Sequence, residues 1–183
     1  MKLSSNILIY RDQLLPYSET FIPAQVNSYQ HYQGIYIGSS LLPTVPATLF
    51  TQQCLTIDQK SLIPNLGKTL YKVLGYIPSG WLSAIQVYSP VLIHAHFGLD
   101  GVLAIPLVRQ LKLPFVVTFH GYYATTEPEP DFNARSPFNW LNYFNKRGQY
   151  FRHLYFRRRH LLFQEADCII AVSQHIRQAL IQK

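Results

Sequence analysis

VLIHAHFGLDGVLAIPLVRQLKLPFVVTFHGYY, residues 91–123, contains two apolar runs with a helical pattern between them. Residues 91–94 and 115–119 are short and rich in β-branched or aromatic side chains, as in fully buried strands. Residues 101–111 repeat apolar side chains at helical spacing,. A strand, a helix and a second strand in this order predict two parallel strands in one sheet.

The same alternation continues on both sides of this stretch. Apolar runs at residues 6–10, 35–37 and 168–172 predict further buried strands, and residues 54–57 offer another short one,. Helices are predicted over residues 21–26, 65–76, 81–87 and 139–165, and after Ser173, which has the character of an N-cap,. The sequence therefore predicts an α/β fold, a parallel sheet with helices on both faces.

The composition is that of a folded protein. The 183 residues are 48% hydrophobic and 14% charged, against roughly 25% charged in an average soluble domain, which excludes generic disorder. Cys54 and Cys168 lack the spacing of metal ligands, and we expect free thiols, with one disulfide as the alternative,. No stretch has the length and apolarity of a signal peptide or a membrane span. We therefore expect a cytoplasmic protein that touches a membrane only at its surface.

The positive charge is concentrated in one segment. The net charge is +7, which indicates an anionic partner. Residues 140–163 combine basic and aromatic side chains, and the candidates for contact with an anionic membrane surface are Arg152, Arg157, Arg158 and Arg159,. The same composition suits nucleic acid, which we consider the weaker hypothesis, and a solvated basic helix face is the simplest alternative.

The residues that follow the predicted strands are the candidates for a ligand site. Ligands of parallel sheets bind at the carboxyl ends of the strands. These ends are residues 11–12, 38–40, 94–98, 120–121 and 173. P-loop, GxGxxG and G-x-S-x-G motifs are absent,. Ser173 is therefore better interpreted as a helix cap than as a nucleophile. Glu19 is either a general base or a first-turn acid that stabilises a helix.

Three histidines fall at this edge. His94 and His96 offer a metal site if Asp100 or His120 completes the ligands, but nothing else supplies an ordered set,. The better hypothesis is a polar pocket in which neutral imidazole bonds a sugar hydroxyl or a carbonyl. Gly98 and Gly121 would let a ligand approach backbone N–H groups.

Three blocks of the sequence together carry a family resemblance. LPYSETFIPAQ (15–25), residues 91–123 and EADCIIAVSQHIRQAL (165–180) resemble the N-terminal domain of family 4 glycosyltransferases. These are GT-B enzymes that use nucleotide-activated sugars. SETFI is similar to the branch that builds bacterial exopolysaccharides, including the colanic-acid type. The resemblance covers the chain and implies that residues 1–183 are one Rossmann-like domain on the acceptor side.

The resemblance also implies roles for individual residues. The histidine of the family's TFHG motif falls on His120, which we expect to be catalytic and to lie beside the transferred sugar. The HAHF element places His96 and Gly98 near the acceptor, and Gly121 belongs with His120. Residues 15–20 correspond to a loop that faces the donor phosphates, which makes Glu19 and Thr20 candidates for substrate binding.

The sequence departs from the family in two ways. Tyr123 stands where the family often has Asp, and the sequence ends at Lys183, before the family's second domain. That domain binds the nucleotide-sugar cosubstrate and carries paired glutamates; no metal or further cofactor is implied. We therefore expect residues 1–183 to be inactive alone. The alternatives are a truncated reading frame, a sequence fragment, or one half of a split enzyme that a separate polypeptide with the second domain completes. The acceptor would be a glycan or a lipid-linked glycan.

Overall fold

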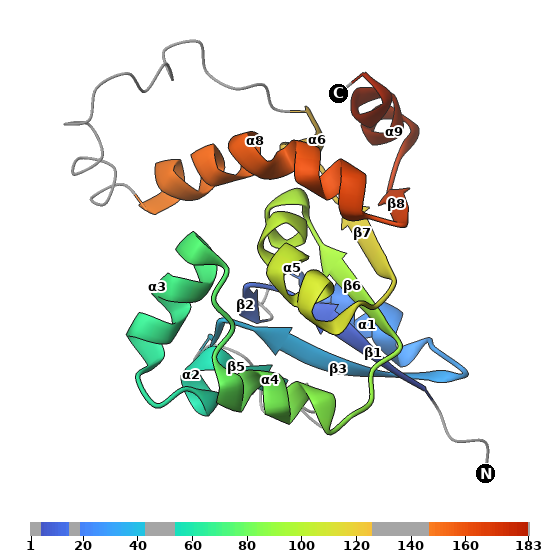
Figure 1. Cartoon of the computed structure of the whole chain (residues 1–183). Helices are drawn as coiled ribbons and strands as arrows, with labels where there is room; N and C mark the ends of the chain where they lie inside the picture. Colours follow the sequence, from blue (N-terminus) through green and yellow to red (C-terminus); the bar gives the residue numbers. More distant parts are fainter. Residues whose placement is uncertain (1–4, 15–18, 43–53, 126–146, 183) are drawn as a thin grey trace, which may run out of the picture.

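The computed structural model describes residues 5–14, 19–42, 54–125 and 147–182, without the side chains of residues 122, 123 and 147–153. A six-stranded sheet with the order β5-β3-β1-β6-β7-β8 forms the centre of the molecule (Figure 1). All of its neighbouring strands are parallel. The strands are β1 (Ser5–Tyr10), β3 (Tyr32–Gly38), β5 (Cys54–Thr56), β6 (Leu92–His96), β7 (Phe115–Phe119) and β8 (Cys168–Ala171). The predicted α/β fold with a parallel sheet is confirmed.

Helices cover both faces of this sheet. The main helices are α1 (Phe21–Asn27), α3 (Pro64–Leu74), α4 (Ser79–Gln86), α5 (Gly98–Leu111), α8 (Arg147–Glu165) and α9 (Gln174–Ile181). Short elements are α2 (Ile57–Lys60), α6 (Tyr122–Thr125) and a parallel pair, β2 (Gln13–Leu14) with β4 (Ser40–Leu41). Leu8 and Tyr10 face the larger core cluster, with side chains of α3, α4, α5 and α8. Ile7 and Ile9 point to the other face and pack with α1, as the period of two in a strand requires.

Two buried polar groups attach helices of the larger cluster at fixed positions. The hydroxyl of Tyr71 on α3 donates to the carbonyl of Leu103 at 2.7 Å. The indole N–H of Trp81 on α4 donates to the carbonyl of Leu55 at 2.9 Å. Buried aromatic side chains of this kind contribute large apolar areas while their polar ends remain satisfied.

Helices α5 and α8 pack closely because α5 has a glycine at the contact. A Cβ at Gly101 would lie 2.8 Å from Cδ1 of Leu162 and 3.1 Å from Cγ1 of Val117. Pro106 lies inside α5 without ending it. The predicted strands and helices are confirmed in type within the described residues, whereas residues 139–146 of the helix predicted over 139–165 lie outside them. β6 extends to His96, and α5 begins at Gly98. His94 and His96 therefore belong to the strand and do not follow it.

Two further observations bear on the sequence predictions. Cys54 and Cys168 are free and lie on β5 and β8, the two edge strands of the sheet. Within the described part of the chain, none of the helices has the length and apolarity to cross a bilayer.

Candidate active site at the carboxyl edge of the sheet

The sheet has its topological switch point between β1 and β6. From β1 the chain proceeds outward through β3 to β5, and then returns to place β6 on the other side of β1. Arg11 and Asp12 follow β1, while Phe97 and Gly98 follow β6. The crevice at such a point is where open α/β sheets bind ligands.

Arg11 is the charged centre of this edge. Its Nε and Nη2 donate to the two carboxylate oxygens of Glu19 at 2.8 and 2.7 Å, and its Nη1 donates to Asp100 at 2.7 Å. The guanidinium also lies over the ring of Phe97, 4.7 Å from its centroid. Burial alone would lower the pKa of Arg11, but Asp100 and Glu19 together raise it above its ordinary value. Arg11 therefore remains charged, with its direction fixed by two carboxylates.

Asp100 is fully buried in the first turn of α5. One of its oxygens accepts from Arg11, and the other accepts the backbone N–H of Asp12 at 3.1 Å. Burial raises the pKa of Asp100 to about 7, against the opposing attraction of Arg11. Both oxygens are thus occupied in joining the ends of β1 and β6.

Asp12 ties the same edge to α3. One carboxylate oxygen accepts from Nζ of Lys72 at 2.7 Å, and the other accepts from the hydroxyl of Ser39 at 2.6 Å. The carbonyl of Asp12 accepts the backbone N–H of Ser39 at 2.8 Å. These bonds hold the loops after β1 and β3 in place.

The rings of the three histidines lie in a row beside the charged group. The ring centroids of His94 and His96 are 4.4 Å apart, and those of His96 and His120 are 5.4 Å apart. Nδ1 of His96 lies 3.1 Å from Nε2 of His120, within hydrogen-bond distance. Nε2 of His94 lies 2.8 Å from the hydroxyl oxygen of Thr118. The predicted clustering of His94, His96 and His120 is therefore present in the structure.

Burial keeps these imidazoles neutral. It lowers the pKa of His94 to about 4, with His120 adding to the effect, and lowers the pKa of His96 further. Burial also lowers the pKa of half-buried His120; nearby Glu19 opposes this shift and Arg11 adds to it. A neutral imidazole has one donor and one acceptor nitrogen, so the cluster offers hydrogen bonds without charge.

The histidines form a bonded pair and do not converge as metal ligands. Nδ1 of His96 and Nε2 of His120 face each other, while both oxygens of Asp100 are engaged elsewhere. Over residues 5–14, 19–42, 54–125 and 147–182, no three His, Cys, Asp or Glu side chains are grouped so that they could hold a metal ion.

Phe97 brings an aromatic ring into the site through an unusual backbone conformation. Its φ of 71° lies in the left-handed region, where a bulky residue is strained,. The conformation is held by its N–H, which donates to the carbonyl of Thr118, and by its carbonyl, which accepts from Gly101. The ring then lies 4.8 Å from that of His120, while the ring of Phe21 is 4.5 Å away on the same imidazole.

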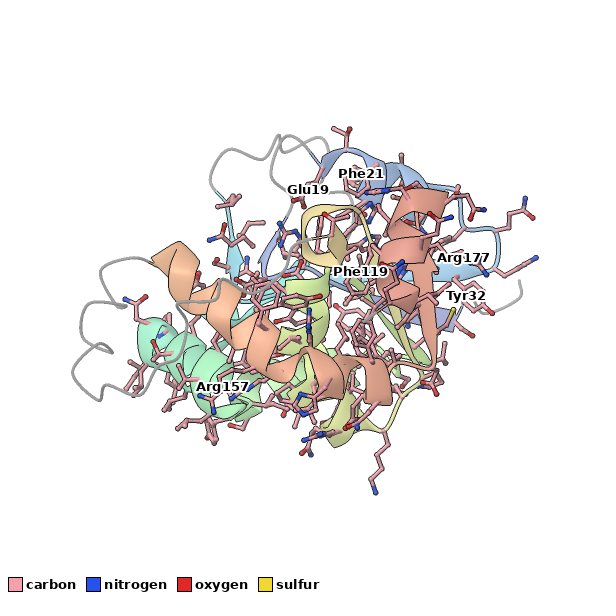
Figure 2. All side chains as sticks on the ribbon, turned by 90° about the horizontal axis from the view of Figure 1, so that it is seen from above. Glu19, Phe21, Tyr32, Phe119, Arg157 and Arg177 are labelled. Carbon is pink, nitrogen blue, oxygen red and sulfur yellow. The ribbon has the colours of Figure 1, made fainter. Side chains whose placement is uncertain are left out.

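The other residues expected at the site are distributed around this core. Glu19 and Phe21 lie close together in Figure 2, and the carboxylate of Glu19 is bound to Arg11. Thr20 occupies the N-cap position of α1 but forms no side-chain cap bond. Gly98 is buried at the start of α5. Gly121 has a φ of 147° and open space where a Cβ would be, so a ligand can reach the backbone there,. Ser173 caps α9 through the N–H of Ile176, as expected.

The candidate arginines of α8 do not share one exposed face. Arg157 is exposed, whereas Nη2 of Arg158 donates to the carbonyl of Val73 on α3 at 3.0 Å. The guanidinium of Arg159 lies 5.4 Å from the ring centroid of Phe156, with Nη1 buried. The side chain of Arg152 lies outside the described residues. Figure 2 shows Arg157 well away from Glu19 and Phe21.

Sequence reasoning gave Arg11 no role of its own and did not foresee the position of Phe97. Arg11 was signalled only by its place after the first strand, and its partner Asp100 is 89 residues away. No pattern in the sequence indicates the positive φ of Phe97.

Comparisons with known proteins bear on the family and the fold. Residues 43–183 match the family model described as Glycosyltransferase Family 4. The fold is similar to that of a sucrose-phosphate synthase from Thermosynechococcus elongatus, with a TM-score of 0.56 and 14% sequence identity. The alignment covers 98% of this chain and 45% of that one, so the chain spans less than half of that relative. No curated protein gave a significant match. On the strength of the family match over most of its length, the chain belongs to glycosyltransferase family 4.

Proposed function

We propose that the chain is the acceptor-side half of a transferase that moves a sugar from a nucleotide-sugar to a glycan or a lipid-linked glycan in bacterial polysaccharide synthesis. The observation that carries the proposal is the neutral, half-buried His120 at the switch-point edge, bonded to His96 and flanked by Phe21 and Phe97. An uncharged hydrogen-bonding group between apolar rings suits the hydroxyls of a sugar.

The surrounding residues have complementary tasks in this proposal. His120 touches the sugar at the reacting end, and Gly121 exposes backbone to the same ligand. Arg11 is paired with Glu19 and Asp100, and it fixes the ends of β1 and β6 beside His120. Glu19 holds Arg11 in place through two hydrogen bonds, a task that replaces the general-base role considered above.

Gly98 and Thr20 adjoin the two aromatic residues that flank His120. Gly98 begins α5 next to Phe97, and Thr20 stands at the start of α1, whose first residue is Phe21. His96 is fully buried, so it acts on a ligand through His120.

Catalysis in this proposal needs a second Rossmann-like domain. A leaving nucleotide diphosphate develops negative charge that positioned donors must stabilise, and Arg11 is already neutralised by Glu19 and Asp100. The described residues therefore supply the acceptor side, and the second domain supplies most of the contacts to the nucleotide-sugar.

The test is to isolate the protein from its own cells, measure the intact mass of every polypeptide present, and assay transfer from a panel of nucleotide-sugars to lipid-linked glycans. We expect transfer in fractions that contain this chain together with the second domain, on the same or a separate polypeptide. Fractions that contain both domains and release no nucleotide from any donor would contradict the proposal.

A second candidate function is binding to an anionic membrane surface. Leu74 and Tyr76 expose apolar side chains at the end of α3, with exposed fractions of 72% and 57%. The bond from Arg158 to Val73 joins α8 to α3. Exposed apolar side chains near basic ones suit the boundary of an anionic bilayer.

Two charge reversals test this candidate. Arg157→Glu lies on α8, whereas Arg177→Glu makes the same charge change on α9, at a separate place in Figure 2. We expect Arg157→Glu to lower co-sedimentation with phosphatidylglycerol vesicles more than Arg177→Glu does. Equal effects of the two variants, or equal binding to phosphatidylcholine vesicles, would exclude a specific docking face; strong salt-dependent oligonucleotide binding would favour nucleic acid instead.

A further inference from the structure

The hydrogen bond between His96 and His120 can be made in two directions. Nδ1 of His96 and Nε2 of His120 are 3.1 Å apart, and one of them carries the shared proton. His96 is neutral, because burial lowers the pKa of its ring far below neutrality. Its ring therefore has one N–H and one lone pair.

The second nitrogen of His96 decides between the two directions. Nε2 of His96 is buried and has no hydrogen-bond partner among the residues that the structure describes. If His120 donated, the single proton of His96 would lie on Nε2 as a buried N–H without an acceptor. If His96 donates from Nδ1, only a lone pair is left at Nε2. Orphaned buried N–H groups are rarer in folded proteins than acceptors with an unused lone pair.

We propose that His96 is a positioning residue: it donates its Nδ1–H to Nε2 of His120 and thereby fixes the proton of neutral His120 on Nδ1. The free nitrogen of His120 is then a hydrogen-bond donor. It recognises an oxygen lone pair, as on a sugar hydroxyl, and cannot accept a proton as a general base. The meaning of this donor for catalysis rests on the proposed function, but the direction of the bond does not.

The surroundings make the donor rigid. His96 is fully buried on β6, and its ring centroid lies 4.4 Å from that of His94, whose Nε2 is engaged with Thr118. The rings of Phe21 and Phe97 lie 4.5 and 4.8 Å from that of His120 and limit its rotation. His96, which donates to His120, lies on a strand, and a group held on a strand is more precisely placed than one on a loop,.

The direct test measures the ring nitrogens of His120 by ¹⁵N NMR of this chain above its titration range. We expect the proton on Nδ1 in the wild type. His96→Leu removes the donor and should give a mixture of the two tautomers. His96→Asn places an amide N–H near the former Nδ1 and should restore the Nδ1–H form.

His94→Asn is the matched control. His94 lies on the same strand as His96 and is similarly buried, but its partner is Thr118, whereas the partner of His96 is His120. It should leave the tautomer of His120 unchanged. A proton on Nε2 of His120 in the wild type overturns the proposal even if no variant folds. An unchanged tautomer in folded His96→Leu overturns it as well.

Turnover separates this inference from the proposed function. In the native preparation we expect His96→Leu to lower kcat roughly tenfold, the order of one lost hydrogen bond, and His96→Asn to recover most of it. If the tautomers behave as expected but the wild-type preparation transfers no sugar, the proposed function fails and the inference stands. If transfer survives His120→Ala, only the active-site role of His120 fails. If His120→Ala abolishes transfer but the substitutions at residue 96 leave the tautomer of His120 unchanged, only the inference fails.

Discussion

Two groups of buried polar side chains lie side by side at the carboxyl edge of the sheet. They compensate for the loss of contact with water in different ways. Around Arg11 the side chains are charged and paired, with Glu19 and Asp100 bound to one guanidinium. Around His96 the side chains are neutral imidazoles whose rings lie against one another, and His96 and His120 share one hydrogen bond. Charge persists where an opposite charge is within reach, and it is lost where only other imidazoles are near.

The difference has a functional consequence. The charged group is rigid and already satisfied, so it joins β1, α1 and α5 and sets a local field. The imidazole group retains unused hydrogen-bonding capacity at half-buried His120. The group around Arg11 therefore holds the loops at the edge of the sheet in place, and the imidazole group faces the ligand.

The largest expected effect comes from removing the shared cation. Arg11→Met leaves Glu19 and Asp100 buried beside each other without a partner, which costs about 3–5 kcal/mol of unfolding free energy,. Urea denaturation followed by far-ultraviolet circular dichroism measures this. A loss below about 1 kcal/mol would mean that the ion pairs do not hold the edge together.

Removing one carboxylate should have a smaller effect. Asp100→Asn retains an oxygen for the N–H of Asp12 and leaves Arg11 bound to Glu19, so we expect a loss of about 1.5–3 kcal/mol, that of one hydrogen bond to a charged group,. The same denaturation experiment applies. A loss as large as that of Arg11→Met would show that Glu19 contributes nothing.

Acid should weaken the imidazole group before the charged one. His94, His96 and His120 have lowered pKa values, so between about pH 6.5 and 4 the unfolded chain binds more protons than the folded one. The free energy of unfolding therefore falls as the pH falls through this window, by on the order of 1 kcal/mol per pH unit for each fully buried imidazole.

Asp100 opposes this trend, which provides a control. Its raised pKa of about 7 means that the folded state holds an extra proton between about pH 4 and 7, so its contribution to stability declines as the pH rises,. Asp100→Asn should therefore steepen the loss of stability in acid. A shallower profile in this variant, or no acid loss in the wild type, would contradict the assignment of charges.

The smallest expected effect is at an exposed ion pair of similar geometry. Arg109 donates to Glu165 at 2.6 Å, but its side chain is 55% exposed. Arg109→Leu should change the unfolding free energy by less than about 1 kcal/mol, and this loss should shrink in salt. An effect equal to that of Arg11→Met would mean that burial is not what separates strong pairs from weak ones.

Much of the fold could be predicted because short apolar strands and amphipathic helices are local patterns. Residues 6–10 and 115–119 form strands as expected, and the run predicted over 168–172 forms β8, which ends at Ala171. The end of β6 was missed because pairing with β7 continues to His96 opposite Thr118, and the register of a neighbour is not visible in one strand's sequence.

The site could be predicted only as a set of residues at one edge. His120, Gly121 and Glu19 do lie there, but the pairing of Arg11 with Asp100 is long-range, and the strain at Phe97 has no sequence signal. The arginines of α8 were grouped by charge alone, whereas the fold engages Arg158 and Arg159 in contacts of their own.

The most direct test of the central claim compares sugar transfer by His120→Ala and His31→Ala in the native preparation. His31 is an exposed histidine and serves as the matched control. We predict that His120→Ala lowers kcat by about 10²–10³, the usual effect of losing a positioned donor, while His31→Ala leaves it unchanged. Equal turnover of the two folded variants would contradict an active-site role for His120 and, with it, the assignment of this edge as the site of transfer.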